Sequence, residues 1–231
     1  MVNEAEHNKI IKPVAVIHTD FSEKFGIPRQ AGLVPELEAR IELLPEFSKP
    51  EAVRELETFS HIWLIWGFSE NKTETANLTV RPPRLGGSTR VGVFASRSPF
   101  RPNGLGLSVV KLKEIITGKN GISIIVCGAD LLDGTPIYDI KPYLPLSDCV
   151  PGALEGYTAG TKNHRLKVVY QPEMLDALKD KKQALIGILE QDPRQTYFQE
   201  PSRIYGLYFA EFNIKFKVSD DILEILEVQK L

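Results

Sequence analysis

The stretch LSVVKLKEIITGKNGISIIVCGADL, residues 107–131, contains two apolar, β-branched runs on either side of a polar turn. Leu107–Ile115 and Ile122–Leu131 have the length and residue types of strands, and Thr117–Gly121 between them is typical of a hairpin turn. Strands that are joined by so short a turn pair antiparallel. The stretch therefore predicts an antiparallel sheet in this part of the chain.

Several other short segments upstream of the hairpin have the pattern of strands. One short amphipathic helix is predicted among them, because Pro50 stands where a helix begins and the apolar residues that follow share a face. Short strands, frequent Gly and Pro, and no βαβ repeat favour a mainly β fold, an antiparallel barrel or sandwich. The predicted strands are Val14–Ile17, Glu38–Leu44, Ile62–Phe68 and Val91–Ala95.

The chain changes character between Ser147 and His164, where one proline and three glycines interrupt all periodicity. We interpret this segment as a boundary between an N-terminal domain, residues 1–148, and a small C-terminal α+β domain, residues 166–231, with a linker at 149–165. In the C-terminal domain we predict a strand, an amphipathic helix and a second strand with clean alternation near its end. They cover Leu166–Tyr170, Glu173–Glu190 and Arg203–Val218.

The segment RPPRLGGSTRVGVFASRSPFRPNGLGLS, residues 81–108, carries five arginines and neither a lysine nor a carboxylate. The whole chain has a net charge of −2, so the remainder carries −7 (−2 minus 5) and the charge is polarised. Guanidinium groups suit carboxylates, phosphates and stacked bases. A plain surface connector is the alternative interpretation, which we favour less because uncompensated arginines repel one another.

Composition and spacing exclude several kinds of site. Cys127 and Cys149 lack the spacing of metal ligands, so no metal site is predicted. No dinucleotide fingerprint, phosphate-binding loop, nucleophile elbow or HExxH occurs. No apolar run approaches the ~20 residues that cross a bilayer, so we expect no membrane association and a cytoplasmic protein. These observations point to an anionic or nucleotide-like ligand and lead no further.

Four motifs together closely resemble the TsaA-like family, to which TrmO-type methyltransferases belong. They are KFGIPRQ at 24–30, RPPRLGG at 81–87, VGVFASRSPFRPN at 91–103 and LLDGTPIYDIKPYLP at 131–145, and DPR-x-x-Tyr at 192–197 extends the resemblance towards the C-terminus. The resemblance implies a β-barrel methyltransferase that works as a homodimer. It would transfer a methyl group from S-adenosylmethionine to N6 of the threonylcarbamoyladenosine beside the tRNA anticodon.

The resemblance also implies which residues form the site. Asp192, Arg194 and Tyr197 would be catalytic. The acceptor nitrogen is flanked by a carbonyl and is a poor nucleophile, so our own hypothesis adds a general base, Asp192 first and Asp133 second. The remaining cations would meet RNA phosphates or loop bases; they are Lys24, Arg81, Arg84, Arg90 and Arg101. The cofactor-binding residues would be Pro28, Arg29, Gln30, Ser69, Glu70, Arg97, Leu107, Gly128, Ala129, Asp130 and Leu131.

Two other functions stay open at this point. A non-catalytic RNA-binding barrel would use the arginines for phosphate contacts and would not bind S-adenosylmethionine. A methyltransferase for another small acceptor would keep the cofactor site without contacting RNA.

Overall fold

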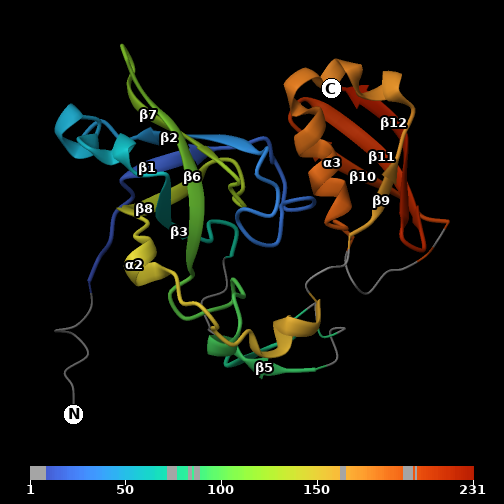
Figure 1. Cartoon of the computed structure of the whole chain (residues 1–231), viewed down its shortest axis with the longest axis horizontal. Helices are drawn as coiled ribbons and strands as arrows, with labels where there is room; N and C mark the ends of the chain where they lie inside the picture. Colours follow the sequence, from blue (N-terminus) through green and yellow to red (C-terminus); the bar gives the residue numbers. More distant parts are fainter. Residues whose placement is uncertain are drawn as a thin grey trace.

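The computed structural model describes residues 9–71, 77–82, 85, 89–161, 165–194, 200 and 202–231. Its N-terminal domain is a closed six-stranded barrel (Figure 1), and every neighbouring pair of strands in it is antiparallel. Around the barrel the strands follow the order β1 (Ala15–His18), β2 (Glu38–Leu43), β7 (Gly121–Cys127), β6 (Leu105–Gly118), β3 (His61–Gly67) and β8 (Thr135–Pro142). The mainly β fold with an antiparallel barrel is confirmed.

The barrel is filled by the inward-facing residues of its strands. Ile17, Ile41, Leu64, Ile124 and Ile137 are fully buried in one apolar cluster. Alternation along each strand places these β-branched and leucine side chains inside and polar ones outside. The barrel interior is therefore a packed core, and a ligand site must lie at its rim.

Two predicted N-terminal elements are wrong. Val91–Ala95 is not one strand: β5 (Val91–Gly92) pairs with β4 (Thr79–Val80), and the chain then turns into the 3₁₀ helix η4 (Val93–Ala95), which the Ser96 hydroxyl caps by donating to the Val93 carbonyl at 2.8 Å. The helix after Pro50 is two 3₁₀ turns, η1 (Pro50–Val53) and η2 (Leu56–Thr58), because Glu55 between them has a left-handed φ of 65°.

The C-terminal domain packs a four-stranded sheet against two helical segments. The sheet order is β10 (Ile204–Phe209), β11 (Phe212–Ser219), β12 (Ile222–Lys230) and β9 (Lys167–Val169), with β9 parallel to β12 and the other pairs antiparallel. The helical segments are η6 (Pro172–Lys181) and α3 (Lys182–Glu190). The expected α+β domain is confirmed.

Two predicted C-terminal elements are also wrong in extent. The helix expected over Glu173–Glu190 is broken at Lys179, where φ is 52° and ψ is −119°, so a 3₁₀ segment precedes a short α-helix. The strand expected over Arg203–Val218 is a hairpin, because Ala210 takes a left-handed φ of 53° and turns the chain back. The alternation from Phe212 is confirmed along β11.

Between the domains the chain forms α2 (Pro145–Asp148) and the 3₁₀ helix η5 (Gly156–Thr161). The hydroxyl of Tyr157 in η5 donates to the Ala95 carbonyl at 3.1 Å, which ties this connection to the segment around β5. Among the described residues, no helix is long and apolar enough to cross a membrane.

The loop between β1 and β2 leaves the barrel and reaches the C-terminal domain (Figure 1). Phe21, Val34 and Leu37 of this loop are at most 4% exposed and belong to the same apolar cluster as the C-terminal core. The rings of Phe21 and Phe209 lie 5.7 Å apart between centroids. The C-terminal core is therefore completed by residues that come from the N-terminal domain.

Candidate active site

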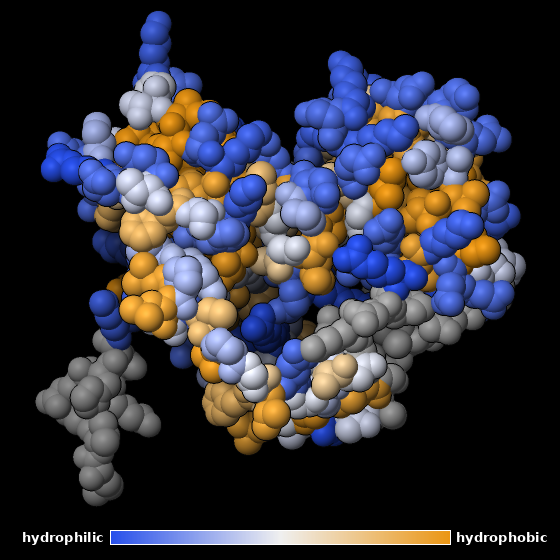
Figure 2. Space-filling model, in the orientation of Figure 1, coloured by the Kyte–Doolittle hydropathy of each residue, from blue (hydrophilic) through white to orange (hydrophobic). Residues whose placement is uncertain are grey.

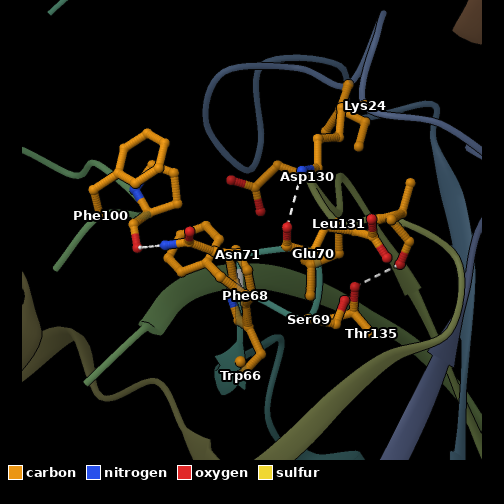
Figure 3. Close-up of a pocket in the computed structure, with 14 residues that line it drawn as sticks. Lys24, Trp66, Phe68, Ser69, Glu70, Asn71, Phe100, Asp130, Leu131 and Thr135 are labelled. Carbon is orange, nitrogen blue, oxygen red and sulfur yellow. Dashed lines mark hydrogen bonds between the residues drawn. The ribbon is translucent and has the colours of Figure 1, made fainter. Parts of the chain in front are cut away.

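A pocket of about 630 Å³ opens at the rim of the barrel, where the chain leaves β3 and β7 (Figure 3). Its volume is typical of a small-molecule site. Figure 3 shows Phe100 on one side of it and Leu131 and Thr135 on the other. The lining residues are Lys24, Ile27, Trp66, Gly67, Phe68, Ser69, Glu70, Asn71, Pro99, Phe100, Asp130, Leu131, Leu132 and Thr135.

Aromatic rings at the end of β3 form the apolar wall of this pocket. Trp66 and Phe68 meet edge to face, with their centroids 4.4 Å apart. Gly106 lies opposite Trp66 on β6, and a side chain at that position would overlap the indole ring. The glycine therefore leaves the space in which Trp66 lies across the neighbouring strand.

A chain of hydrogen bonds fixes one carboxylate of the pocket. The Trp66 indole N–H donates to the Ser108 hydroxyl at 3.1 Å, and this hydroxyl donates to Oδ1 of Asp130 at 2.7 Å. Burial raises the pKa of Asp130, and the Ser108 hydrogen bond, backbone N–H groups and the Arg97 charge offset only part of this effect. Asp130 is thus held in one orientation at the pocket.

A second pocket of about 180 Å³ lies between the β1–β2 loop and the C-terminal domain. The loop contributes residues 24–29, and the C-terminal domain contributes Ile188, Gln191, Asp192 and Pro193. Lys24 and Ile27 line both pockets, so the two sites are adjacent. Figure 2 shows that this face of the molecule is hollowed where the barrel, the C-terminal domain and the segment around β5 meet.

Asp192 and Arg194 form a bidentate pair in the loop after α3. Nε and Nη2 of Arg194 donate to the two carboxylate oxygens of Asp192, each at 2.8 Å. The side chains are 9% exposed for Arg194 and 15% for Asp192, and hydrogen bonding to Asp192 raises the pKa of Arg194. The pair is thus largely enclosed. Tyr197, the third predicted catalytic residue, lies outside the described residues.

Asp133, the second candidate for the general base, stands in a turn. Its carboxylate accepts the backbone N–H of Thr19 at 3.1 Å and lies 3.3 Å from Nδ1 of His18. This arrangement ties the start of the β1–β2 loop to the turn before β8, and Asp133 lines neither pocket. Within the described chain, no group of three or more His, Cys, Asp or Glu side chains gathers as metal ligands do.

The structure brings together most of the predicted cofactor residues. Ser69, Glu70, Asp130 and Leu131 line the larger pocket, and Pro28 and Arg29 line the smaller one. Gln30 and Arg97 line neither pocket, but Nη1 of Arg97 donates to Oε1 of Gln30, and Arg97 is close enough to lower the pKa of Asp130.

Besides Gln30 and Arg97, three more predicted cofactor residues line neither pocket. Gly128, at φ 80°, donates to the Leu37 carbonyl at 2.7 Å and accepts from Gly32 at 2.8 Å, which fastens the β1–β2 loop to the end of β7. Ala129 is buried in the barrel core. Leu107 is 55% exposed on β6.

The described members of the predicted RNA-binding cations come from several segments. Lys24 lines both pockets. Arg90 donates to the Thr79 hydroxyl at 2.9 Å, and Arg101 donates to the Ser96 carbonyl at 3.2 Å, so each braces its own segment. Arg81 is exposed. Arg84 lies outside the described residues.

Sequence reasoning missed several residues of the pocket wall. Trp66 and Phe68 look like core residues in a central strand, although their spacing of two, with Gly67 between them, places both on one face at the rim. Asn71, which donates to the Pro99 carbonyl at 2.7 Å, closes the side near Phe100. No local signal in the sequence distinguishes these residues from an ordinary strand exit.

Comparison with known proteins identifies the class of protein to which this barrel and its site belong. The family model of the tRNA-methyltransferase O N-terminal domain matches residues 16–149, and that of the TrmO C-terminal domain matches residues 163–231. The chain belongs to the TrmO family.

Individual relatives cover almost the whole chain. The chain is 37% identical over 225 residues to the tRNA (adenine(37)-N6)-methyltransferase of Escherichia coli K12. This alignment covers 94% of this chain and 96% of the relative. The chain is 38% identical over 228 residues, with the same coverage, to a Pseudomonas aeruginosa protein whose name proposes an S-adenosylmethionine-dependent methyltransferase. A crystal structure of TrmO superposes with a TM-score of 0.77 at 33% identity, over 96% of this chain and 99% of that one.

Proposed function

We propose that this protein transfers a methyl group from S-adenosylmethionine to N6 of the adenine at position 37 of tRNA. Similarity over most of the chain to relatives that are named tRNA (adenine(37)-N6)-methyltransferases carries the proposal. The finer proposal is that the acceptor is N6-threonylcarbamoyladenosine, and that a cytoplasmic homodimer acts with its cofactor site near the interface.

The larger pocket fits the proposed methyl donor in size and in charge. S-adenosylmethionine supplies, when bound, an activated methyl group on a positively charged sulfur. Glu70 and Asp130 line the pocket with carboxylates, and Trp66 and Phe68 line it with aromatic rings. Carboxylates and aromatic faces both attract cations. Lys24 is the only cationic side chain among the described lining residues.

We assign the hydrogen-bonded group around Gln30 to the methionine portion of the donor. A guanidinium such as that of Arg97 can hold a carboxylate in a bidentate way, and Gln30 orients it through their hydrogen bond. Backbone groups at 128–131 follow the end of β7 and would contact the donor next to the Asp130 carboxylate.

Methyl transfer is an in-line displacement, so the protein has to hold acceptor and donor about 3–3.5 Å apart. Asp192, Arg194 and Tyr197 are the proposed catalytic residues, with the Asp192 carboxylate taking the proton from the acceptor nitrogen. Asp192 borders the smaller pocket, which Lys24 and Ile27 connect to the larger one. The smaller pocket is therefore the proposed side from which the tRNA base approaches.

Nucleoside analysis tests the proposal. Mass spectrometry of tRNA from a strain that lacks the gene should show loss of the N6-methylated nucleoside, and the purified protein with S-adenosylmethionine should restore it to that tRNA. Retention of the methylated nucleoside would point to another acceptor. Absence of any calorimetric signal with S-adenosylmethionine would point to a non-catalytic RNA-binding barrel.

A further inference from the structure

We propose that the C-terminal domain is a structural part of the methyl-donor site, because it fixes the conformation of residues 24–30 through Phe25 and Gly26. The inference rests on the proposed function, in which Gln30, at the end of this segment, orients Arg97 towards the methionine portion of the donor. Phe25 and Gly26 are then positioning residues, which act through their neighbours in the loop.

An aromatic stack joins the loop to the C-terminal sheet. The ring of Phe25 lies parallel to that of Phe216 on β11, with centroids 6.5 Å apart and an interplanar angle of 9°. Phe216 is fully buried and stacks in turn on Tyr205 of β10, at 5.5 Å. Such ring pairs add to the free energy of burial and have a preferred geometry. The stack therefore sets the orientation of the loop as well as its distance from the sheet.

Gly26 makes the closest approach of the loop to the sheet. It has φ of 93°, in the left-handed region, and a β-carbon there would overlap the side chain of Leu207 on β10. Leu207 is fully buried in a close-packed core, so its side chain has little room to move aside. Only glycine fits both the backbone conformation and the space at this position.

Contacts with the C-terminal domain also hold the chain before and after residues 24–30. Ahead of the segment, the ammonium of Lys181 pairs with the Asp20 carboxylate. After it, Val34 packs on α3 at Gly187, where a β-carbon would lie 2.8 Å from the Val34 side chain. The segment is thus held at both ends and in the middle by one domain.

The fixed loop reaches the barrel side of the site through its last residue. Gln30 accepts a hydrogen bond from Arg97, and Ile27 and Lys24 line the larger pocket. A shift of the loop would move all three side chains relative to Asp130 and Trp66. The C-terminal domain therefore controls the shape of a pocket whose walls come mostly from the barrel.

The test measures S-adenosylmethionine binding to the full-length Gly26→Ala protein by calorimetry, together with its thermal unfolding. We expect affinity to fall by roughly tenfold or more at a temperature at which the variant is fully folded, because an overpacked contact must displace the loop. A purely structural role would lower the Tm and leave the affinity unchanged. Adding Leu207→Val, which shortens the opposing side chain, should restore part of the lost affinity.

Two further variants complete the design. Gly152→Ala imposes the same strain at φ 74° with no atom within 4 Å of the new methyl group, and it should bind the donor like the wild type. Phe25→Leu removes the stack on Phe216 and keeps an apolar side chain, and it should weaken donor binding even if Gly26→Ala does not fold.

Three outcomes would overturn the inference. Wild-type affinity in both Gly26→Ala and Phe25→Leu would show that the contact does not position the loop. Failure of Leu207→Val to restore any affinity to a folded Gly26→Ala protein would remove Leu207 as the cause. If the wild-type protein itself bound no S-adenosylmethionine, the proposed function would fail first and the inference with it.

Discussion

At the scale of single residues, Asp130 links the pocket to the pH dependence of stability. Burial raises its pKa in the folded protein above the unfolded value. Between these two pKa values the folded state binds more protons than the unfolded state, so stability falls as pH rises through this window. The carboxylate therefore lowers stability at neutral pH, which is a cost that a functional role would explain.

We predict that Asp130→Asn removes this pH dependence. Relative to the wild type, the free energy of unfolding of the variant should increase as the pH rises above about 4, the usual pKa of an aspartate, because only the wild type has to deprotonate Asp130 in the folded state. Urea unfolding at several pH values measures the difference. Asp139→Asn removes an exposed carboxylate from the barrel surface and serves as the control. A difference that stays constant with pH would contradict the prediction.

Asp192 allows stability and catalysis to be separated at one residue. Asp192→Asn places an amide N–H against one of the two Arg194 donors, so we expect a loss of about 1–3 kcal/mol in the free energy of unfolding. The proposed role as general base predicts in addition a slower single-turnover methylation at temperatures where the variant is folded. Methylation at the wild-type rate would show that Asp192 is not the base.

At the scale of elements, the pairing of β3 with β6 builds the aromatic wall. Gly106→Ala would push a methyl group into the Trp66 ring, and we expect it to destabilise the barrel by about 1–3 kcal/mol. Urea unfolding measures the effect, and the quenching of tryptophan fluorescence should change as the indole moves. Gly92→Ala, which meets no atom within 4 Å, should change neither quantity.

The elements that sequence could predict are those whose signals are local. The β6–β7 hairpin and the apolar β3 depend on composition and turn residues within a few positions. β8 was missed because the Asp133-Gly134 turn and two prolines obscured the strand around Ile137. The break at Lys179 was missed because lysine has no preference for a positive φ, so its residue type does not mark the break.

The candidate site was predictable only in part, for a related reason. Resemblance to a family placed Glu70 and Asp130 in the site, and both line the larger pocket. The Trp66–Ser108–Asp130 chain of hydrogen bonds was not foreseen, since it joins three segments that become neighbours only when the barrel closes. The periodicity of one strand does not show which strand lies next to it or in which register.

At the scale of the whole molecule, charge is separated between the exposed arginines and an otherwise acidic chain. Arg81→Ala should weaken tRNA binding and reduce the slope of log Kd against log salt concentration by about one, because one phosphate contact is lost. Affinity for S-adenosylmethionine should not change. Lys119→Ala, at the tip of the β6–β7 hairpin, is the matched control. An unchanged salt slope in Arg81→Ala would count against an RNA contact there.

The packing of Phe21 against Phe209 has a consequence for how the protein is made. Chains leave the ribosome N-terminus first, and barrel strands can pair as they emerge. The β1–β2 loop, however, cannot bury Phe21, Val34 and Leu37 in their common core until the C-terminal domain has been synthesised. The β1–β2 loop is thus translated early but packed late. A chain truncated before the C-terminal domain would form a barrel whose β1–β2 loop is not held in place.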